Sequence, residues 1–284
     1  KRRVMRSRER RGTAAGEGRA SRLPGPRAKH RQRIGEPDSD DGVARRYGFA
    51  GGLVPGIVVY AHLIRPLVDA FGLEWLERGG AAARFVKPCY DGEEIVVRAK
   101  RHGPSALGLV VERAGGEVCA AGTAALRAAP EVLPEPGECA ERALPKERPA
   151  ASADSLRPGT SLGTVISRPD PRRDGFADAI GDDSPAYRGG EAAVHPGFLL
   201  GLANEALARN VVLGPWIHAA SEVTNLSVAR SGDTLRARSR IVDRFDRKVH
   251  ELVVLDVLVL AEPDRPVQRI RHTAIYRPRP AERT

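Results

Sequence analysis

Residues 54–63 read Val54-Pro55-Gly56-Ile57-Val58-Val59-Tyr60-Ala61-His62-Leu63, and the apolar run continues to Phe71. A second stretch of the same kind opens at residue 195 and reads His195-Pro196-Gly197-Phe198-Leu199-Leu200-Gly201-Leu202. In both stretches the proline suits a first helical turn, and the glycine permits close approach of another backbone or a ligand. A Pro-Gly pair that recurs after roughly 140 residues predicts a duplicated domain, because solenoid repeats are much shorter.

The charge of the chain is concentrated at its N-terminal end. Residues 1–35 hold 13 basic and two acidic residues, whereas the rest of the 284-residue chain holds 33 basic and 34 acidic residues. Residues 1–38 show no hydrophobic periodicity, so we expect a basic disordered tail. The tail has no aromatic residues on which bases could stack, so we do not expect nucleic acid as the partner. Nucleic-acid binding through the tail would require a steep salt dependence that disappears when residues 1–35 are deleted.

Other features of the sequence exclude several classes of protein. No run of about 18 uncharged apolar residues is present, and the start lacks the apolar core of a secretory signal, so we expect a cytoplasmic protein without a membrane span. The odd number of cysteines, without a CxxC pair, predicts free thiols rather than a disulfide framework. No spacing resembles a metal-ligand set or a nucleotide fingerprint, so we expect neither a metal nor a cofactor.

The first half of the folded chain, residues 39–129, predicts one long helix followed by antiparallel strands. Apolar residues recur at three- and four-residue spacings from residue 55 to about residue 71, which indicates one apolar helix face. Pro66 lies inside this run and should kink or split the helix. Runs with the pattern of strands follow, joined by glycine-containing turns, at residues 81–88, 95–99, 107–112 and 118–124.

The second half, residues 161–280, repeats this plan. Residues 130–160 are rich in proline, glutamate and alanine and show no core pattern, so we interpret them as a linker. A helix is predicted from residue 196 to about residue 210, and strands near residues 217–229, 234–243, 249–261 and 266–277. A long helix across a strongly curved antiparallel sheet, twice in tandem, is an α+β arrangement whose two sheets could join into one.

The two halves resemble hotdog domains, and the chain resembles the tandem (double) hotdog proteins of the MaoC-like hydratase/dehydratase superfamily over about residues 40–278. The segments that carry the resemblance are Gly48-Phe49-Ala50-Gly51-Gly52-Leu53-Val54-Pro55-Gly56, Gly181-Asp182-Asp183-Ser184-Pro185-Ala186-Tyr187 and His195-Pro196-Gly197. The resemblance implies two domains that each have a long central helix wrapped by a curved antiparallel sheet. It also implies an acyl thioester, either acyl-CoA or an acyl-carrier thioester, as the partner.

In the hydratases of this superfamily the second segment usually reads G-D-x-N-P-x-H, and its Asp and His handle the water that adds to a trans-2-enoyl thioester. This sequence has Ser184 for the Asn and Tyr187 for the His. A tyrosine, with a pKa of about 10, is a poor base, but it can donate a hydrogen bond or orient a carbonyl. The resemblance therefore implies Asp182, Tyr187 and His195 as catalytic residues. It implies substrate binding by Pro55, Gly56, Ser184, Pro196 and Gly197, with amides near Gly197 or Gly56 at the thioester oxygen.

Each of these residues also has a plainer interpretation. Asp182 could be a turn residue in a loop rich in Asp, Ser, Pro and Gly. Tyr187 could be a packed aromatic residue with a satisfied hydroxyl. His62 follows the first Pro-Gly pair and could supply a base or be structural. His218, His250 and His272 are expected to be structural or surface residues.

These observations leave three functions open. The first is reversible hydration of an enoyl thioester, with Asp182 activating water and His195 or Tyr187 assisting. The second is hydrolysis of the thioester by carboxylate-activated water, which does not need the missing His. The third is acyl-CoA binding without turnover, as a sensor or as a subunit that completes a partner's active site. Two fused hotdog domains already form a pair, so we expect a monomer or a homodimer.

Overall fold

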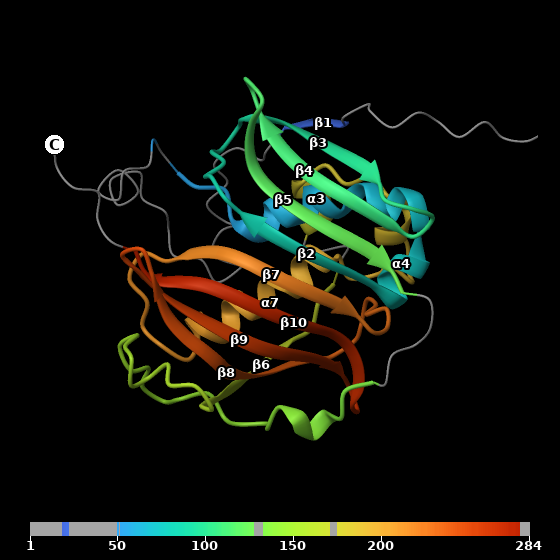
Figure 1. Ribbon diagram of the computed structural model, residues 1–284. Helices are drawn as coiled ribbons and strands as arrows, with labels where there is room; N and C mark the ends of the chain where they lie inside the picture. Colours follow the sequence, from blue (N-terminus) through green and yellow to red (C-terminus); the bar gives the residue numbers. More distant parts are fainter. Residues whose placement is uncertain (1–18, 23–49, 51, 128–132, 171–174, 279–284) are drawn as a thin grey trace, which may run out of the picture.

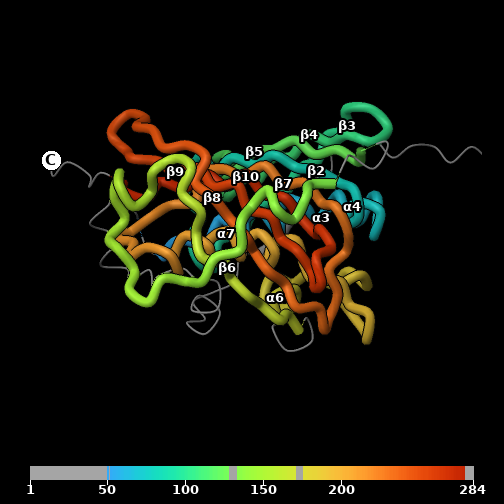
Figure 2. The backbone as a smooth tube through the Cα atoms, turned by 90° about the horizontal axis from the view of Figure 1, so that it is seen from below, coloured from blue at the N-terminus to red at the C-terminus, as the bar shows by residue number. Residues whose placement is uncertain are grey.

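The computed structural model describes residues 19–22, 50, 52–127, 133–170 and 175–278. Its centre is one ten-stranded antiparallel sheet with the strand order β1-β3-β4-β5-β2-β7-β10-β9-β8-β6. The helices lie against one face of this sheet (Figures 1 and 2). The two halves join where β2 pairs with β7, with Ala82 opposite Glu222. The sheets of the two repeats therefore form one surface, as predicted.

The first half contains the long helix and the strands that the sequence predicts. The helices are α3 (Gly56–Phe71) and α4 (Leu73–Arg78), and the strands are β2 (Gly79–Phe85), β3 (Glu94–Arg101), β4 (Ala106–Arg113) and β5 (Glu117–Leu126). Pro66 does not split the helix, because α3 continues through this residue; the predicted kink stays a prediction. The flanking residues Arg65 and Leu67 are both buried, so tertiary packing on α3 outweighs the hydrogen bond that proline cannot donate.

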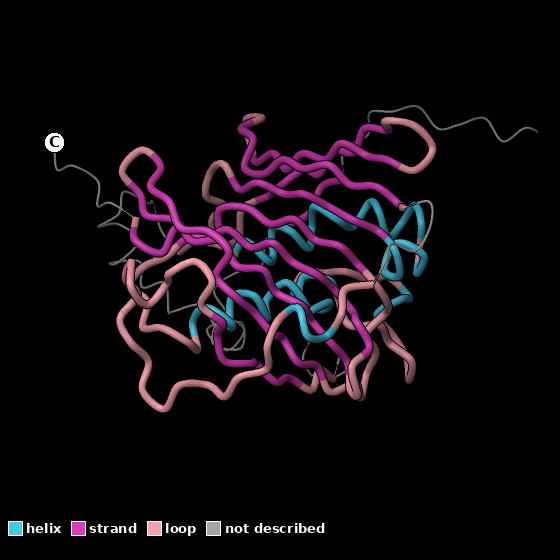
Figure 3. The backbone as a smooth tube through the Cα atoms, turned by 60° about the horizontal axis from the view of Figure 1, so that its bottom comes forward, coloured by secondary structure: helices cyan, strands magenta, loops and turns pink. Residues whose placement is uncertain are grey.

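The second half repeats the arrangement with longer strands. Its elements are β6 (Ser161–Ser167), α6 (Phe176–Ala179), the 3-10 turn η2 (Pro185–Tyr187), α7 (Pro196–Ala208), β7 (Ile217–Asn225), β8 (Leu235–Arg247), β9 (His250–Ala261) and β10 (Arg265–Arg277). Figure 3 shows α3 and α7 beneath the continuous sheet. Strand β6 was not predicted, because it pairs only with β8, which is distant in sequence. Helix α4 was not predicted either, because it is only six residues long and follows α3 directly.

Two predictions for the connecting segments need correction. Residues 19–22 of the expected tail form β1 (Arg19–Arg22), which pairs with β3; the rest of residues 1–38 lies outside the described residues. The described part of the expected linker contains the 3-10 turn η1 (Pro136–Glu138) and packs on the protein. Cys139 is buried against Leu258 and Leu260 of β9, and Leu156 is fully buried. Isolated apolar residues thus anchor the linker to the protein.

The helices α3 and α7 pack closely because small residues lie where they meet. A Cβ atom on Gly197 would lie 3.0 Å from Ala61 Cβ, and one on Gly201 would lie 3.3 Å from Ile57 Cδ1. Both helices are buried on most sides, including Leu63 in α3 and Leu200 in α7. This contact brings polar residues of α3 next to the loop that precedes α7.

Both long helices begin in the same way, which shows how the repeats correspond. The amide of Val54 donates to Cys89 O, and that of Val194 donates to Ala229 O. Pro55 O accepts the first helical amides of α3, and His195 O accepts those of α7. His195 is therefore the counterpart of Pro55, and the Pro-Gly pairs are offset by one position although they look alike in sequence.

A close contact between α3 and the sheet supplies a test of this packing. A Cβ on Gly122 of β5 would lie 2.5 Å from Ala82 O and 3.2 Å from Leu63 Cδ2 of α3. We expect Gly122→Ala to lower the free energy of unfolding by about 1–3 kcal/mol, because overpacking forces backbone shifts. Urea unfolding measures the change. Gly214→Ala is the control, since a Cβ there meets no atom within 4 Å. Equal stability of the two variants would contradict the packing described.

Candidate functional site

Asp182 and His195 form a buried pair at the start of α7. Asp182 Oδ2 lies 3.5 Å from His195 Nε2, and the two side chains are 1% and 3% exposed. The contact is longer than an ordinary hydrogen bond. His195 Nδ1 accepts a hydrogen bond of 2.9 Å from the Gly197 amide. In the neutral imidazole the proton therefore resides on Nε2, the nitrogen that faces the carboxylate.

The loop that carries Asp182 is held from several directions. Asp182 Oδ1 accepts a 3.0 Å hydrogen bond from the Ser184 amide, so the residue is a turn residue as well as half of the pair. Its amide donates to Ala177 O, and its carbonyl accepts from Arg188 Nη2 at 2.7 Å. The sequence Asp-Asp-Ser-Pro favours such a turn through side chain to backbone hydrogen bonds. Only Oδ2 of the carboxylate is left to face His195.

Burial and pairing set the protonation of the pair. Burial alone would raise the pKa of Asp182, but His195, the Ser184 amide and Arg65 outweigh it and hold that pKa below its usual value. Burial lowers the pKa of His195, and Asp182 offsets only part of that effect. At neutral pH the pair thus consists of a carboxylate beside a neutral imidazole.

Arg65 of α3 links the first half of the chain to this loop. It donates a 2.6 Å hydrogen bond to Gly181 O and pairs with Asp183. Its Nε atom lies 3.9 Å from Asp182 Oδ1. The side chain of Arg65 is 7% exposed, so its charge stays buried only because carboxylates surround it.

Several polar atoms in this region have no hydrogen-bond partner among the described residues. They are Tyr187 Oη, Tyr60 Oη, His62 Nε2, Asp182 Oδ2 and His195 Nε2. Burial raises the pKa of Tyr187 well above 10, and the Asp182 charge adds to this effect. Burial, His195 and Arg65 lower the pKa of His62 to about 4 against the opposing influence of Asp182. Such a concentration of unsatisfied groups is typical of sites that bind water or substrate.

A small cavity adjoins His195. Its volume is about 10 Å³, and Phe176, Tyr187, His195 and Phe198 are among the residues that line it. This is close to the smallest space that holds one water molecule. The ring of His195 lies 4.5 Å from that of Tyr187 and 5.0 Å from that of Phe176, measured between centroids. The aromatic rings therefore shield the His195 imidazole from bulk water.

The amides at the start of α7 do not match the predicted oxyanion site. The Gly197 amide already donates to His195 Nδ1, and Pro196 has no amide hydrogen. The amides of Phe198 and Leu199 both donate to His195 O. The expectation that Gly197 holds the thioester oxygen is therefore contradicted, because His195 caps the helix. Ser184 caps η2 by accepting from the Ala186 amide at 3.4 Å, which is a structural role.

The structure separates Pro55 and Gly56 from the Asp182–His195 pair. They line a different cavity of about 390 Å³ at the start of α3, together with Trp216 and His218. A third cavity, of about 530 Å³, is lined by Arg78, Arg127, Arg230 and Arg265, among others. This arginine-lined cavity lies near the start of α7, since Ala193 forms a bridge with Arg230.

Tyr60, His62 and Arg65 complete the site from the first half, and only His62 was considered a candidate from the sequence. The sequence could have identified Arg65 as a candidate, because an arginine within an apolar helical run must have a buried partner or leave the core. The sequence contained no such indication for Tyr60, since an aromatic residue on an apolar helix face is ordinary.

In the described parts of the chain, no group of three or more His, Cys, Asp or Glu residues could hold a metal ion. No helix of the described residues is both long and apolar enough to cross a membrane.

The arrangement can perform acid–base chemistry on water. An ionised carboxylate with one free oxygen lies beside an N–H donor, within a site from which bulk water is excluded. Tyr187 lies against the ring of His195. The imidazole that faces the carboxylate belongs to residue 195.

No protein-family model and no curated protein sequence matches the chain. Solved structures do match it. A putative MaoC domain protein dehydratase from Chloroflexus aurantiacus is 13% identical, with a TM-score of 0.63 over 92% of this chain and 95% of that one. A conserved hypothetical protein from Mycobacterium tuberculosis, described as having a double hotdog fold, is 17% identical, with a TM-score of 0.59 over 92% and 96%. A putative oleoyl thioesterase from Lactobacillus plantarum is 14% identical, with a TM-score of 0.51 over 94% and 98%.

At sequence identities this low, the structural matches establish a common fold and nothing more. The matches extend over nearly the whole chain and include both repeats. The order of elements, a long helix followed by antiparallel strands in each half, agrees with them. The chain therefore has the double hotdog fold, and its predicted resemblance to the MaoC-like proteins is confirmed at the level of the fold.

Proposed function

We propose that this protein binds acyl thioesters and catalyses the reversible hydration of a trans-2-enoyl thioester at the Asp182–His195 pair. The observation that carries the proposal is the 3.5 Å contact between Asp182 Oδ2 and His195 Nε2 in a buried site. It supports an Asp/His arrangement in a chain that has Tyr187 at the position where the hydratase motif has its His. The dehydration of a 3-hydroxyacyl thioester is the same reaction in reverse.

The proposed reaction uses the carboxylate as a general base. The Asp182 carboxylate takes one proton from the water, and the water oxygen bonds to the β-carbon of the enoyl group. The π electrons move toward the thioester oxygen. The Asp182 carboxylic acid then delivers its proton to the α-carbon, so that one water is added and the carboxylate is restored. His195 orients the carboxylate through its Nε2–H. A positioned general base such as the Asp182 carboxylate contributes about 10²–10⁴-fold in rate.

In this proposal Tyr187 donates to the thioester oxygen the hydrogen bond that the α7 amides do not offer. Its hydroxyl has no partner among the described residues, and its raised pKa keeps it protonated. A protonated phenol can donate to the thioester oxygen as negative charge develops there. This role differs from that of the family's His, which titrates near neutrality.

The arginine-lined cavity supports an anionic carrier. Its lining includes Arg78, Arg127, Arg230 and Arg265, and arginine suits the phosphates of coenzyme A or of a pantetheine-bearing protein. Val194, next to His195, pairs with Ala229, and Ala229 precedes Arg230. The carrier phosphates would thus lie on one side of this short backbone pairing of residues 193–194 with residues 229–230, and the reacting acyl group on the other.

The test is an assay of the full chain with crotonyl-CoA and longer enoyl-CoAs. We expect loss of the conjugated-enoyl absorbance without release of free thiol. Thiol release from saturated acyl-CoA would instead identify a thioesterase, the function that the ionised Asp182 and the thioesterase neighbour favour as runner-up. Neither signal, together with saturable acyl-CoA binding, would mean a binding module. A cytoplasmic location, the absence of a cofactor and a monomeric or homodimeric state stay predictions of the sequence.

A further inference from the structure

Arg65 belongs to the candidate site although it lies on α3, in the other half of the chain from Asp182 and His195. Ala61 of α3 packs against the start of α7, where a Cβ on Gly197 would lie 3.0 Å from Ala61 Cβ. Arg65 follows Ala61 by four residues, so it lies on the same face of α3, about one helical turn further along. The packing of the two helices thus carries the guanidinium to the loop that precedes α7.

The guanidinium contacts each residue of the loop segment 181–183. Its Nη1 donates to Gly181 O at 2.6 Å, and its Nη2 pairs with Asp183. Its Nε lies 3.9 Å from Asp182 Oδ1, which is an electrostatic contact rather than a hydrogen bond. The planar fork of arginine lets one side chain hold both neighbours of Asp182 while Nε lies beside the carboxylate. A lysine, with a single charged nitrogen, would replace only part of this arrangement.

Arg65 is buried, whereas its hydrogen-bond partners are not. Its side chain is 7% exposed, that of Asp183 is 84% exposed, and Gly181 is exposed as well. The buried charge is therefore little screened by water where it faces Asp182. Loss of Arg65 would leave neither Gly181 nor Asp183 buried without a partner, so its removal is compatible with folding.

Among the described residues, Arg65 is the main positive charge beside the pair. Arg188 donates to Asp182 O, but it also pairs with Asp178, which balances its charge. Burial is the leading cause that lowers the pKa of His62 to about 4, so this residue is neutral near pH 7. The remaining titratable groups that face the pair or Tyr187 are acidic or phenolic: Asp183, Asp69, Tyr60 and Tyr187 itself.

Arg65 opposes the binding of a proton by either member of the pair. Burial would raise the pKa of Asp182, but His195, the Ser184 amide and Arg65 outweigh it. Burial lowers the pKa of His195, and Arg65 lowers it further against the influence of Asp182. A proton added to either residue is a positive charge close to a buried guanidinium, so the sign of the effect is the same for both. The two residues titrate as a pair, and Arg65 acts on the pair as a whole.

We propose that Arg65 is a positioning residue for the Asp182–His195 pair, which it supports from the first half of the chain. Its fork holds Gly181 and Asp183, and thereby keeps the carboxylate between them in front of His195. Its buried charge keeps the pair as a carboxylate beside a neutral imidazole. The second half thus carries the base, and the first half keeps that base ionised. The inference rests on the proposed function for its kinetic assay, whereas the protonation of the pair can be measured without turnover.

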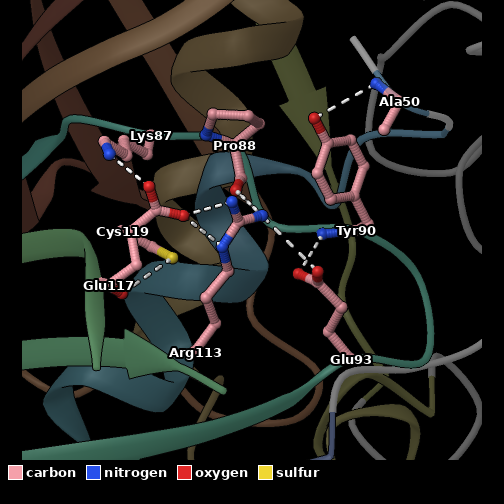
Figure 4. Close-up of polar contacts among 8 residues, drawn as sticks. All are labelled: Ala50, Lys87, Pro88, Tyr90, Glu93, Arg113, Glu117 and Cys119. Carbon is pink, nitrogen blue, oxygen red and sulfur yellow. Dashed lines mark hydrogen bonds and ion pairs between the residues drawn. The ribbon is translucent and has the colours of Figure 1, made fainter. Parts of the chain in front are cut away.

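Arg113, on β4 of the same half, provides a matched control, as Figure 4 shows. Its Nε donates to Glu117 at 2.5 Å, and its Nη1 lies 3.5 Å from both Glu93 Oε1 and Pro88 O. Like Arg65, it contacts two carboxylates and one backbone carbonyl. None of these partners belongs to the Asp182 loop. The substitution of Arg113 therefore removes a comparable set of contacts without changing the charge beside the pair.

The test compares Arg65→Met with the wild-type chain. Methionine favours helices and has an unbranched side chain without charge. We expect kcat for crotonyl-CoA hydration to fall by about 100-fold, the loss that a misplacement of reacting groups by about 1 Å can cause, while KM changes only a few-fold. From about pH 7.5 to about pH 5, kcat/KM of the wild-type chain should stay level. That of Arg65→Met should fall toward the acid end, because the pair then binds a proton more readily.

Two further variants separate the charge from a general disturbance. Arg65→Lys keeps a positive charge, so its kcat/KM should stay level with pH although kcat falls. Arg113→Met should keep both kcat and the level profile. Far-UV circular dichroism at each pH checks that the variants are folded. A loss of kcat in Arg65→Met with a level pH profile would make Arg65 a merely structural residue and overturn the inference. An equal fall toward acid pH in Arg65→Lys would overturn it as well.

NMR of the pair decides the inference independently of the proposed function. The aspartate carboxyl carbons of the full chain are labelled with carbon-13, and the resonance that Asp182→Asn removes is assigned to Asp182. Over the same pH range we expect this resonance to stay constant in the wild-type chain and in Arg113→Met, and to move toward the protonated form in Arg65→Met. A wild-type chain that hydrates no enoyl thioester would refute the proposed function, while this shift would still support the role of Arg65. An Asp182 resonance that behaves alike in the wild-type chain and in folded Arg65→Met would overturn that role, whether or not the chain is a hydratase.

Discussion

Asp182→Asn should lower kcat for enoyl-thioester hydration by about 10²–10⁴-fold, the usual contribution of a positioned general base. The variant retains the shape of the side chain, and its carbonyl oxygen can still accept the Ser184 amide that now binds Asp182 Oδ1 at 3.0 Å. The amide group cannot take a proton from water. Its NH₂ would also face the Nε2–H of His195, so that two donors would oppose each other where a carboxylate and an imidazole now lie 3.5 Å apart.

The control for this prediction removes a carboxylate that contacts the Asp182 loop only through Arg188. Asp178 is 67% exposed and pairs with Arg188, so Asp178→Asn should retain hydration within a few-fold. Turnover and far-UV circular dichroism are measured on both variants. Hydration that survives Asp182→Asn in a folded protein would remove Asp182 from the catalytic role, and the first assay would then be repeated for thioester hydrolysis.

The sequence predicts the architecture well because local signals and the required burial agree. The apolar spacing in residues 55–71, the glycine turns and the strand patterns all point to a long helix followed by a meander, and the structure contains both in each half. The prediction failed where a long-range partner decides the structure. Strand β6 exists because β8 lies beside it, and residues 19–22 form a strand only against β3.

At the candidate site, too, the sequence could not indicate contacts between residues that are distant in the chain. Asp182, Tyr187 and His195 lie close together in sequence, and the structure brings their side chains together. Arg65 reaches Gly181 O across 116 positions of the chain, which no local pattern could indicate. The Pro-Gly repeat even misleads at one point, because His195 takes the place of Pro55 and caps its helix. The amide that seemed free for a thioester is therefore occupied.

Acid should destabilise the folded chain steeply between about pH 6 and pH 4, because four buried histidines are neutral in the folded state. Burial is the leading cause that lowers each pKa: to about 4 for His62, to about 3 for His272, below the usual value for His195 and well below it for His218. In the unfolded chain these groups titrate near pH 6.5. Below that pH the unfolded chain binds more protons than the folded chain, so the free energy of unfolding falls as pH falls.

The expected size of this effect follows from the number of groups. Below about pH 6 each histidine contributes about 1.4 kcal/mol per pH unit until its folded-state pKa is reached. His62, His218 and His272, whose pKa values are lowered most, therefore give together a slope of about 4 kcal/mol per pH unit. His195 adds to this slope only above its own folded-state pKa. This loss is comparable to the whole stability of an ordinary domain, which is about 5–15 kcal/mol. The lowered pKa of Asp182 acts in the same direction, but only below about pH 4, where the unfolded carboxyl becomes protonated.

Urea unfolding at several pH values from 7.5 to about 4 measures the slope. His272→Gln removes a titrating group and can keep a hydrogen bond to Ser221, so it should reduce the slope by about a third. His102→Gln is the control, since His102 is exposed and water solvates it in both states. A free energy of unfolding that stays constant from pH 7 to pH 5 would mean that these imidazoles become charged without unfolding. Ser221, Asp182 and their neighbours would then have to stabilise charges that the buried geometry is expected to exclude.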